Sequence, residues 1–235
     1  MSKLYMDLGN TSLKVFNEQG ELLGAYNKYM DNWEEDFKRI FEPTCYVSCI
    51  LASVATKAEL SKIKSLLPDG ISLTEASFNL GLWSVVPCYQ DPSKLGIDRL
   101  LAMEAAFRES ESSVVVIDCG SAVTVDYVSQ TGFHEGGYIV PGYRLQMESL
   151  LRDTSLSFED IRPSLGLGQS TSECIRNGSL RMITSLCESV IERYQPSVVV
   201  LTGGDLSGDL SSLSQLGRRD DLLVFKGLNY VYKSV

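Results

Sequence analysis

The chain has 235 residues, 44% hydrophobic and 22% charged, and carries a formal net charge of -9. This composition is ordinary for a soluble globular protein, and the length allows one large or two small domains with a core that needs no disulfide or metal. The negative charge disfavours nucleic-acid binding. No apolar stretch approaches the roughly 18 residues of a membrane span, so we expect no membrane partner either.

Cysteine and histidine narrow the chemistry further. The six cysteines form no C-x-x-C pair, and the N-terminal residues do not resemble a signal peptide. We therefore expect reduced thiols in the cytoplasm; the alternative, a zinc site, lacks the usual ligand spacing. His134 is the only histidine, and its glycine-rich surroundings predict a surface turn. If the protein is an enzyme, a carboxylate is then the expected general base.

The first half of the chain alternates strands and helices. Strand patterns cover residues 4–16 and 21–29, separated by a turn at 17–20, and predict a hairpin. The remaining expected elements are a helix over 33–41, a strand over 46–54, a helix over 57–67, a short strand over 71–73 and a helix over 99–107. Between the last two lies an irregular stretch, residues 75–97. Irregular segments of that length in compact domains are usually functional.

The second half repeats this pattern. We expect strands over 114–117, 123–128, 138–140 and 198–201, and helices over 145–151 and 171–194. A further helix and a terminal strand over 222–225 complete the chain.

An internal repeat is the clearest structural signal. Asp7-x-Gly9-Asn10 matches Asp118-x-Gly120-Ser121 at a distance of 111 residues, and each copy follows a strand and precedes strand-like residues and a turn. Duplication of one supersecondary unit explains this. It predicts two lobes, residues 1–111 and 112–235, that face each other across a central cleft. The glycines allow backbone N–H groups to approach phosphate, and the aspartates suit Mg²⁺, which often binds through water.

These motifs resemble those of a known superfamily. Residues 7–14 (DLGNTSLK) and 118–126 (DCGSAVTVD) resemble the two phosphate motifs of the acetate and sugar kinase, chaperone and actin superfamily, and 202–205 (TGGD) its adenosine motif. Residues 89–99, 136–142 and 223–228, in this order, narrow the resemblance to type III pantothenate kinases, from Asp7 to Leu228. The resemblance implies an α/β, two-lobed, duplicated actin-like (ribonuclease H-like) fold.

The same resemblance implies an activity and a nucleotide site. ATP would phosphorylate the primary hydroxyl of pantothenate, the first step of coenzyme A biosynthesis, in a reaction that depends on positioning and charge stabilisation. Asp7 would associate with Mg²⁺, directly or through water, and Asp118 would bind a monovalent cation, K⁺ or NH₄⁺. Ser121 stands where the family usually has Thr, which keeps the hydroxyl and loses a methyl group. The implied ATP-binding residues are Asp7, Leu8, Gly9, Asn10, Thr11, Ser12, Leu13, Lys14, Ser121, Gly203 and Gly204.

The resemblance also assigns the acceptor site. Asp98 of the Gly-x-Asp-Arg stretch would be the catalytic base; its alternative is the N-cap of a helix that starts at Arg99. The fork of Arg99 suits a carboxylate or a hydroxyl array. Thr171 matches a threonine that the family supplies from the partner subunit, which implies a homodimer. The implied substrate-binding residues are Tyr89, Gly96, Ile97, Asp98, Arg99 and Thr171.

Two assignments stay open at this point. Tyr89 is either a pantothenate contact or a core aromatic, and Asp126 is either a supporting carboxylate or an exposed strand residue.

Three rival functions remain. Another small-molecule kinase of the superfamily would phosphorylate a sugar and not pantothenate. A non-catalytic regulator is possible because some relatives are described as accessory transcription factors, although Asp7, Asp98 and Asp118 are all retained. An actin-like filament protein would pellet with ATP.

Overall fold

The computed structural model describes residues 2–42, 46–80, 82–157 and 159–233. The chain divides into two compact units, each with its own sheet. Unit 1 comprises Met1–Arg108 together with Leu222–Val235, and unit 2 comprises Glu109–Asp221. The C-terminal segment therefore belongs with the first unit, whereas the sequence placed it in the second lobe.

Unit 1 is built on a five-stranded sheet with strand order β3-β2-β1-β4-β5. Strands β1, β2 and β3 pair antiparallel, while β4 and β5 continue the sheet parallel to β1. The predicted hairpin is present, but the strand expected over residues 4–16 is split by a turn into β1 and β2. The bounds are β1 Ser2–Leu8, β2 Ser12–Phe16, β3 Leu22–Asn27, β4 Tyr46–Ser53 and β5 Ser72–Glu75.

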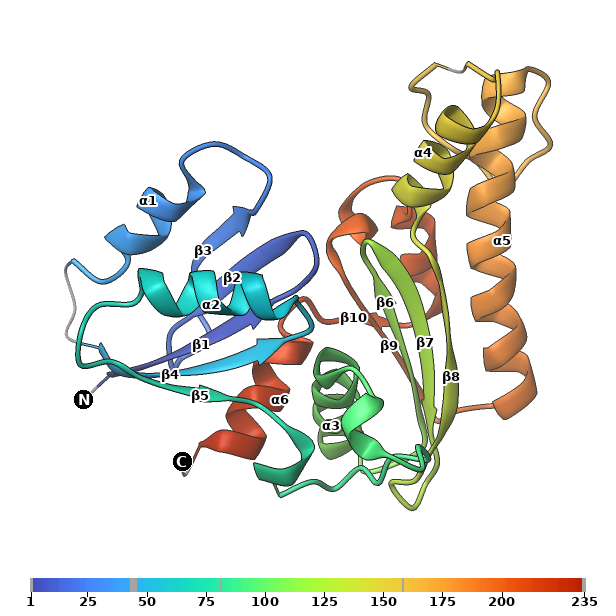
Figure 1. Ribbon diagram of the computed structural model, residues 1–235. Coiled ribbons are helices and arrows are strands. Elements are labelled where there is room, and N and C mark those ends of the chain that lie inside the picture. The colour runs from blue at the N-terminus through green and yellow to red at the C-terminus, as the bar shows by residue number, and fades with distance from the viewer. Residues whose placement is uncertain (1, 43–45, 81, 158, 234–235) are drawn as a thin grey trace. The chain divides into compact units, whose positions relative to one another are not determined.

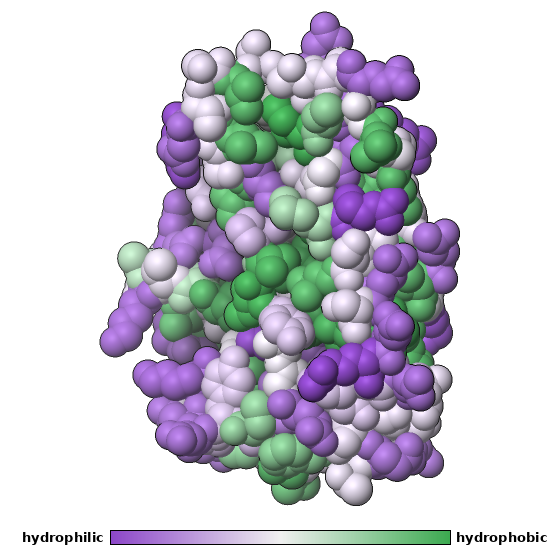
Figure 2. Space-filling view, turned by 90° about the vertical axis from the view of Figure 1, so that its right-hand side faces the viewer, coloured by the Kyte–Doolittle hydropathy of each residue, from purple (hydrophilic) through white to green (hydrophobic). Residues whose placement is uncertain are grey.

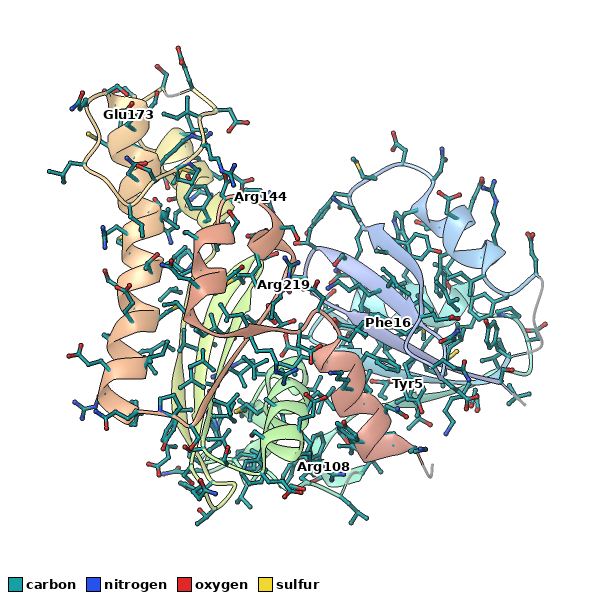
Figure 3. The ribbon with its side chains drawn as sticks, turned by 180° about the vertical axis from the view of Figure 1, so that it is seen from behind. Tyr5, Phe16, Arg108, Arg144, Glu173 and Arg219 are labelled. Carbon is teal, nitrogen blue, oxygen red and sulfur yellow. The ribbon has the colours of Figure 1, made fainter. Side chains whose placement is uncertain are left out.

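Helices cover both faces of this sheet (Figure 1). Leu4, Met6 and Leu8 alternate along β1 toward one face, where they pack with α1 (Trp33–Arg39) and α2 (Lys57–Leu66). Tyr5 points to the other face, where its ring meets Phe225 of α6 (Leu223–Tyr232) at 5.4 Å. Figure 3 labels Tyr5 and Phe16, which both lie toward α6. Helix α3 (Ile97–Ser110) contributes Leu101 to this second cluster.

The terminal strand expected over residues 222–225 is wrong, because these residues begin α6. A short apolar run does not distinguish a strand from a buried helix by periodicity alone. The continuation resolves it, since Leu228, Val231 and Tyr232 are buried at helical spacing. Gly227 allows close approach, because a Cβ there would lie 2.2 Å from the carbonyl oxygen of Leu101.

Unit 2 repeats the sheet of unit 1. Its strand order is β10-β9-β6-β7-β8, with β6, β7 and β8 antiparallel and β9 and β10 added parallel to β6. This is the same connectivity as in unit 1, so the predicted duplication and actin-like topology are confirmed. The bounds are β6 Val114–Cys119, β7 Ala122–Val128, β8 His134–Pro141, β9 Val198–Thr202 and β10 Arg218–Arg219.

Helices α4 (Tyr143–Asp153) and α5 (Thr171–Tyr194) pack on one face of this second sheet. Valines 115, 123 and 125 and Ile117 meet apolar residues of both helices there. Where one helix was expected between residues 205 and 221, the chain forms two short 3₁₀ helices, η3 (Gly204–Ser207) and η4 (Ser211–Leu216). Two further 3₁₀ turns, η1 (Phe78–Leu80) and η2 (Pro92–Lys94), interrupt the irregular stretch of unit 1, in which Gly81 lies outside the described residues.

Cys45 lies outside the described residues, and the five cysteines inside them are free thiols. Within the described ranges, no helix has the length and apolar character that crossing a membrane requires.

Candidate active site

The turn between β1 and β2 forms the first candidate phosphate loop. The Gly9 N–H donates to the carbonyl of Ser12 at 3.0 Å, and the Thr11 carbonyl accepts from the Lys28 N–H at 3.0 Å. Leu8 and Leu13 are fully buried in the core, so only their backbone can reach a ligand. A Cβ on Gly9 would come no closer than 3.7 Å to any neighbour. Packing alone therefore does not require glycine at position 9. The missing side chain instead leaves space beside the backbone of the turn.

Asp7 has a strongly perturbed carboxyl group in unit 1. It lies directly opposite Lys14 in the β1–β2 pair. Burial raises the pKa of Asp7 to about 6; the charge of Lys14 opposes this rise and the charge of Asp98 adds to it. Carboxylates influence each other in this way only at short range, so β1 and α3 place Asp7 and Asp98 near one another. Strongly perturbed carboxyl groups of this kind are typical of functional sites.

Asp98 lies in the first turn of α3. The helix begins at Ile97 and not at Arg99, so the N-cap alternative for Asp98 is not borne out. A carboxylate oxygen of Asp98 accepts from the Arg99 N–H at 2.7 Å. A Cβ on Gly96 would lie 2.6 Å from that same oxygen. The glycine therefore makes room for the Asp98 carboxylate.

Arg99 and Tyr89 are brought together beside this carboxylate. Arg99 is buried, and its guanidinium donates to the Tyr89 hydroxyl at 3.2 Å. Tyr89 is partly exposed, so it is not a core aromatic.

A pocket of about 310 Å³ adjoins this region of unit 1. Its volume is at the lower end of the range for small-molecule sites. Gly96 and Ile97 line it, together with the end of β4, residues 76–79 and residues 92–95. Tyr89, Asp98 and Arg99 are not among its lining residues.

In unit 2, three connections meet at one edge of the sheet. The Gly120 N–H donates to the Ala122 carbonyl at 3.1 Å, and the Gly142 N–H donates to the Ser121 carbonyl at 3.0 Å. Gly203 has φ 107°, and a Cβ there would lie 2.2 Å from the carbonyl oxygen of Cys119. The second phosphate motif and the adenosine motif are thus packed against each other. Only glycine fits at position 203.

Asp118 lies at the same edge of unit 2. Burial raises the pKa of the Cys119 thiol, and Cys187, Asp118 and Asp205 raise it further in smaller steps. The predicted cation ligand Asp118 and the adenosine-motif residue Asp205 are therefore both close to Cys119.

A second pocket, of about 520 Å³, extends from the adenosine motif. Gly204 and the residues that follow form one wall, and α4 forms another. Burial raises the pKa of Asp205, Arg144 lowers it, and Asp209 raises it. Tyr143 is buried there, and burial raises the pKa of its hydroxyl; Asp209 adds to this rise and Arg176 opposes it. Sequence reasoning missed Tyr143 and Arg144, because no motif marks α4; Figure 3 labels Arg144.

The prediction that His134 is a surface turn residue is wrong. His134 is completely buried, and its Nε2 lies 3.0 Å from a carboxylate oxygen of Asp126, which is also buried. Strand β8 begins at His134 and pairs with β7, so the sheet holds the two side chains together. Buried polar groups are tolerated when they are hydrogen-bonded. Asp126 is therefore a supporting carboxylate of the sheet.

Thr171 and the predicted metal ligands differ in their surroundings. Thr171 is the exposed first residue of α5, where Ser170 caps the helix by accepting from the Glu173 N–H at 3.2 Å. The described residues contain no cluster of three His, Cys, Asp or Glu side chains that could hold a metal. Mg²⁺ usually binds through one or two carboxylates completed by water and phosphate, a pattern that Asp7 beside Asp98 fits.

Comparison with known proteins identifies related sequences. A family described as type III pantothenate kinase matches residues 3–193. The chain is similar to the type III pantothenate kinase of Alcanivorax borkumensis, with 37% identity over 86% of each sequence. It also resembles that of Hahella chejuensis, with 33% identity over 100% of this chain and 99% of the relative.

Solved structures share the fold at low sequence identity. One described as a Baf family transcriptional activator from Campylobacter jejuni gives a TM-score of 0.64 at 22% identity, covering 96% of this chain and 94% of that one. An activator of 2-hydroxyisocaproyl-CoA dehydratase from Clostridium difficile gives 0.52 at 10% identity, covering 97% and 92%. At these identities the likeness shows the fold alone.

Proposed function

Because this chain belongs to the type III pantothenate kinases, we propose that it transfers a phosphoryl group from ATP to the primary hydroxyl of pantothenate, using the residues described above. This reaction is the first step of coenzyme A biosynthesis. The observation that supports the residue assignment is the hydrogen bond between Arg99 and Tyr89, beside the Asp98 carboxylate in the first turn of α3.

Asp98 acts as the general base. Its carboxylate accepts the hydroxyl proton while the hydroxyl oxygen attacks the terminal phosphorus atom. Arg99 and Tyr89, already hydrogen-bonded to each other, bind the acceptor beside it. Gly96 and Ile97 contribute backbone next to the same carboxylate. The activation barrier is then lowered by positioning the acceptor hydroxyl and by stabilising charge on the phosphates, as phosphoryl transfer generally requires.

ATP binds through the two phosphate motifs and the adenosine motif. The side chains of Asn10, Thr11 and Lys14 contact phosphate oxygens, and the backbone of Leu8, Gly9, Ser12 and Leu13 forms the turn that holds them there. Ser121, Gly203 and Gly204 contribute from unit 2. The open space at Gly9 and Gly120, where a Cβ would meet no atom closer than 3.7 Å and 3.9 Å, supports a close approach of ligand to backbone.

Two cations complete the proposal. Mg²⁺ is held by Asp7, directly or through water, and supplies positive charge to the phosphates. Burial and the neighbouring Asp98 both disfavour the ionised form of Asp7, and a bound cation offsets both effects. Asp118 binds the monovalent cation, K⁺ or NH₄⁺.

Thr171 completes the acceptor site of a second copy in a homodimer. Large apolar side chains of α4 and α5, Leu145, Leu151 and Met182, are exposed in the single chain. Figure 2, which looks onto the α5 side of unit 2, shows apolar areas between hydrophilic ones. This exposure supports the proposal; the homodimer and the cytoplasmic location stay predictions.

A coupled assay tests the proposed function. Purified protein, ATP and Mg²⁺ are combined with pantothenate or with a panel of sugars, in potassium, ammonium or lithium salts. We expect phosphorylation of pantothenate alone, with turnover in potassium or ammonium and much less in lithium. Turnover of a sugar in place of pantothenate would overturn the assignment.

Two matched variants test the base. Asp98→Asn should lower kcat by about 10²–10⁴-fold while ATP affinity stays near the parent value. Asp91→Asn is the control, because Asp91 is exposed and its carboxylate bonds to Ser93 in the same segment. Full activity of Asp98→Asn would remove Asp98 as the base.

A further inference from the structure

The segment between β5 and α3 carries acceptor residues but has little regular structure. It contains Tyr89 and Gly96, and it leads directly into the first turn of α3, with Asp98 and Arg99. For the Tyr89 hydroxyl to remain hydrogen-bonded to Arg99, the segment must be attached to α3. The attachment is at Glu104, less than two turns beyond Asp98 on α3 and about 9 Å from it by helix rise.

Glu104 is completely buried, and its carboxylate bonds to the segment's backbone. It accepts from the Ser84 N–H at 2.9 Å and from the Val85 N–H at 2.8 Å. The guanidinium of Arg108, labelled in Figure 3, pairs with the same carboxylate and donates to the Leu82 carbonyl at 2.7 Å. Two side chains of α3 thus hold three nearby positions of the segment, 82, 84 and 85.

The contact of Glu104 with the segment is strong because a buried carboxylate depends on its hydrogen-bond donors. Burying the carboxylate away from water costs free energy, which only hydrogen bonds and a paired charge offset. If residues 82–85 moved away from α3, the carboxylate would lose both N–H donors. Tyr89 follows Val85 by four residues, which span at most about 14 Å of extended chain. Holding Val85 on α3 therefore keeps Tyr89 within a short reach of Arg99 on the same helix.

We propose that Glu104, supported by Arg108, is a positioning residue for the acceptor: it fixes residues 82–85 on α3 and thereby keeps the Tyr89 hydroxyl on Arg99. The proposal rests on the proposed function for the roles of Tyr89 and Arg99. Glu104 is completely buried and is not among the residues proposed to contact ATP or pantothenate.

The first test is Glu104→Gln, which keeps the shape but replaces one acceptor oxygen with an NH₂ group facing N–H donors. We expect the KM for pantothenate to rise about 10-fold, with kcat and the KM for ATP within about 2-fold of the parent. Ile63→Val is the control: Ile63 lies on α2 and is buried in a core cluster that contains none of residues 82–89, so its loss of packing should lower stability without changing the KM for pantothenate.

A double-mutant cycle tests the route through Tyr89. If Glu104 acts by placing that hydroxyl, Glu104→Gln should raise the KM no further in a Tyr89→Phe background. Additive effects of the two substitutions would overturn the proposal. If Glu104→Gln does not fold, Arg108→Lys replaces it, because lysine keeps a charge near Glu104 but loses the fork that reaches Leu82.

Hydrogen exchange separates this proposal from the proposed function. Amides of residues 82–89 should exchange faster in Glu104→Gln than in the parent, whereas Ile63→Val should leave them unchanged. Parent-like exchange together with a parent-like KM would overturn the positioning role. If the parent protein does not phosphorylate pantothenate, the proposed function fails, and the exchange rates still decide whether Glu104 holds the segment.

Discussion

Replacing Asp7 by asparagine should make the protein more stable at neutral pH while removing its activity. The folded protein holds the Asp7 carboxyl group where its pKa is about 6, against an ordinary value of 3.8, because of burial and the nearby charge of Asp98. Between these two values the folded state binds a proton that the unfolded chain releases. Stability therefore falls as the pH rises through this window. Asparagine resembles the protonated form at every pH.

The magnitude follows from the pKa difference. Each unit of difference between folded and unfolded states corresponds to about 1.4 kcal/mol, so ionising Asp7 costs up to about 3 kcal/mol above pH 6. Lys14, which lowers the pKa of Asp7, keeps this cost from being larger. Below pH 3.8 the carboxyl group is protonated in both states and the cost disappears.

Urea unfolding between about pH 3.5 and pH 8, in EDTA to remove divalent cations, measures this difference. The parent and Asp7→Asn should coincide at the acidic end and diverge through the window, with the variant more stable at pH 8. Asp69→Asn, at an exposed position, should stay within about 0.5 kcal/mol of the parent throughout. Equal pH dependence of the parent and Asp7→Asn, or a less stable variant at pH 8, would refute the reasoning.

Gly9→Ala should change the free energy of unfolding by less than about 1 kcal/mol, since a Cβ there meets no atom closer than 3.7 Å, yet it should weaken ATP binding by narrowing the loop. Gly203→Ala should instead destabilise the fold by more than about 2 kcal/mol, because φ is 107° and the Cβ would strike the Cys119 carbonyl; melting curves and ATP titrations distinguish the two. His134→Ala should cost about 3 kcal/mol by taking the histidine from the buried Asp126 carboxylate, as urea unfolding would show.

The sequence predicted most of the fold through local pattern. Alternating apolar residues in β1 and helical spacing in α2 identified those elements, and the repeated Asp-x-Gly motif predicted the duplicated sheet. Element ends were less certain, as at α3, which begins two residues before the expected start. The terminal run at 222–225 was assigned wrongly because four apolar residues fit a strand and a helix equally well.

The candidate site was predicted only where a motif marked it. Motifs identified Asp7, Asp98 and Arg99. In unit 1, the charge of Asp98 contributes to the raised pKa of Asp7, and Arg99 is hydrogen-bonded to Tyr89. Glu104 carries no motif, because its role depends on the backbone N–H groups of Ser84 and Val85 that the fold places beside it.

The sequence by itself determined the two copies of one strand pattern and the acidic and glycine residues at the ends of their first strands, since these depend on residue type and spacing along the chain. Only the tertiary structure decided that α6 joins unit 1, that the single histidine is buried against Asp126, and that Asp7 holds its proton more tightly than a free carboxyl group. Burial and through-space charge arise from neighbours distant in the chain, and no local pattern encodes them.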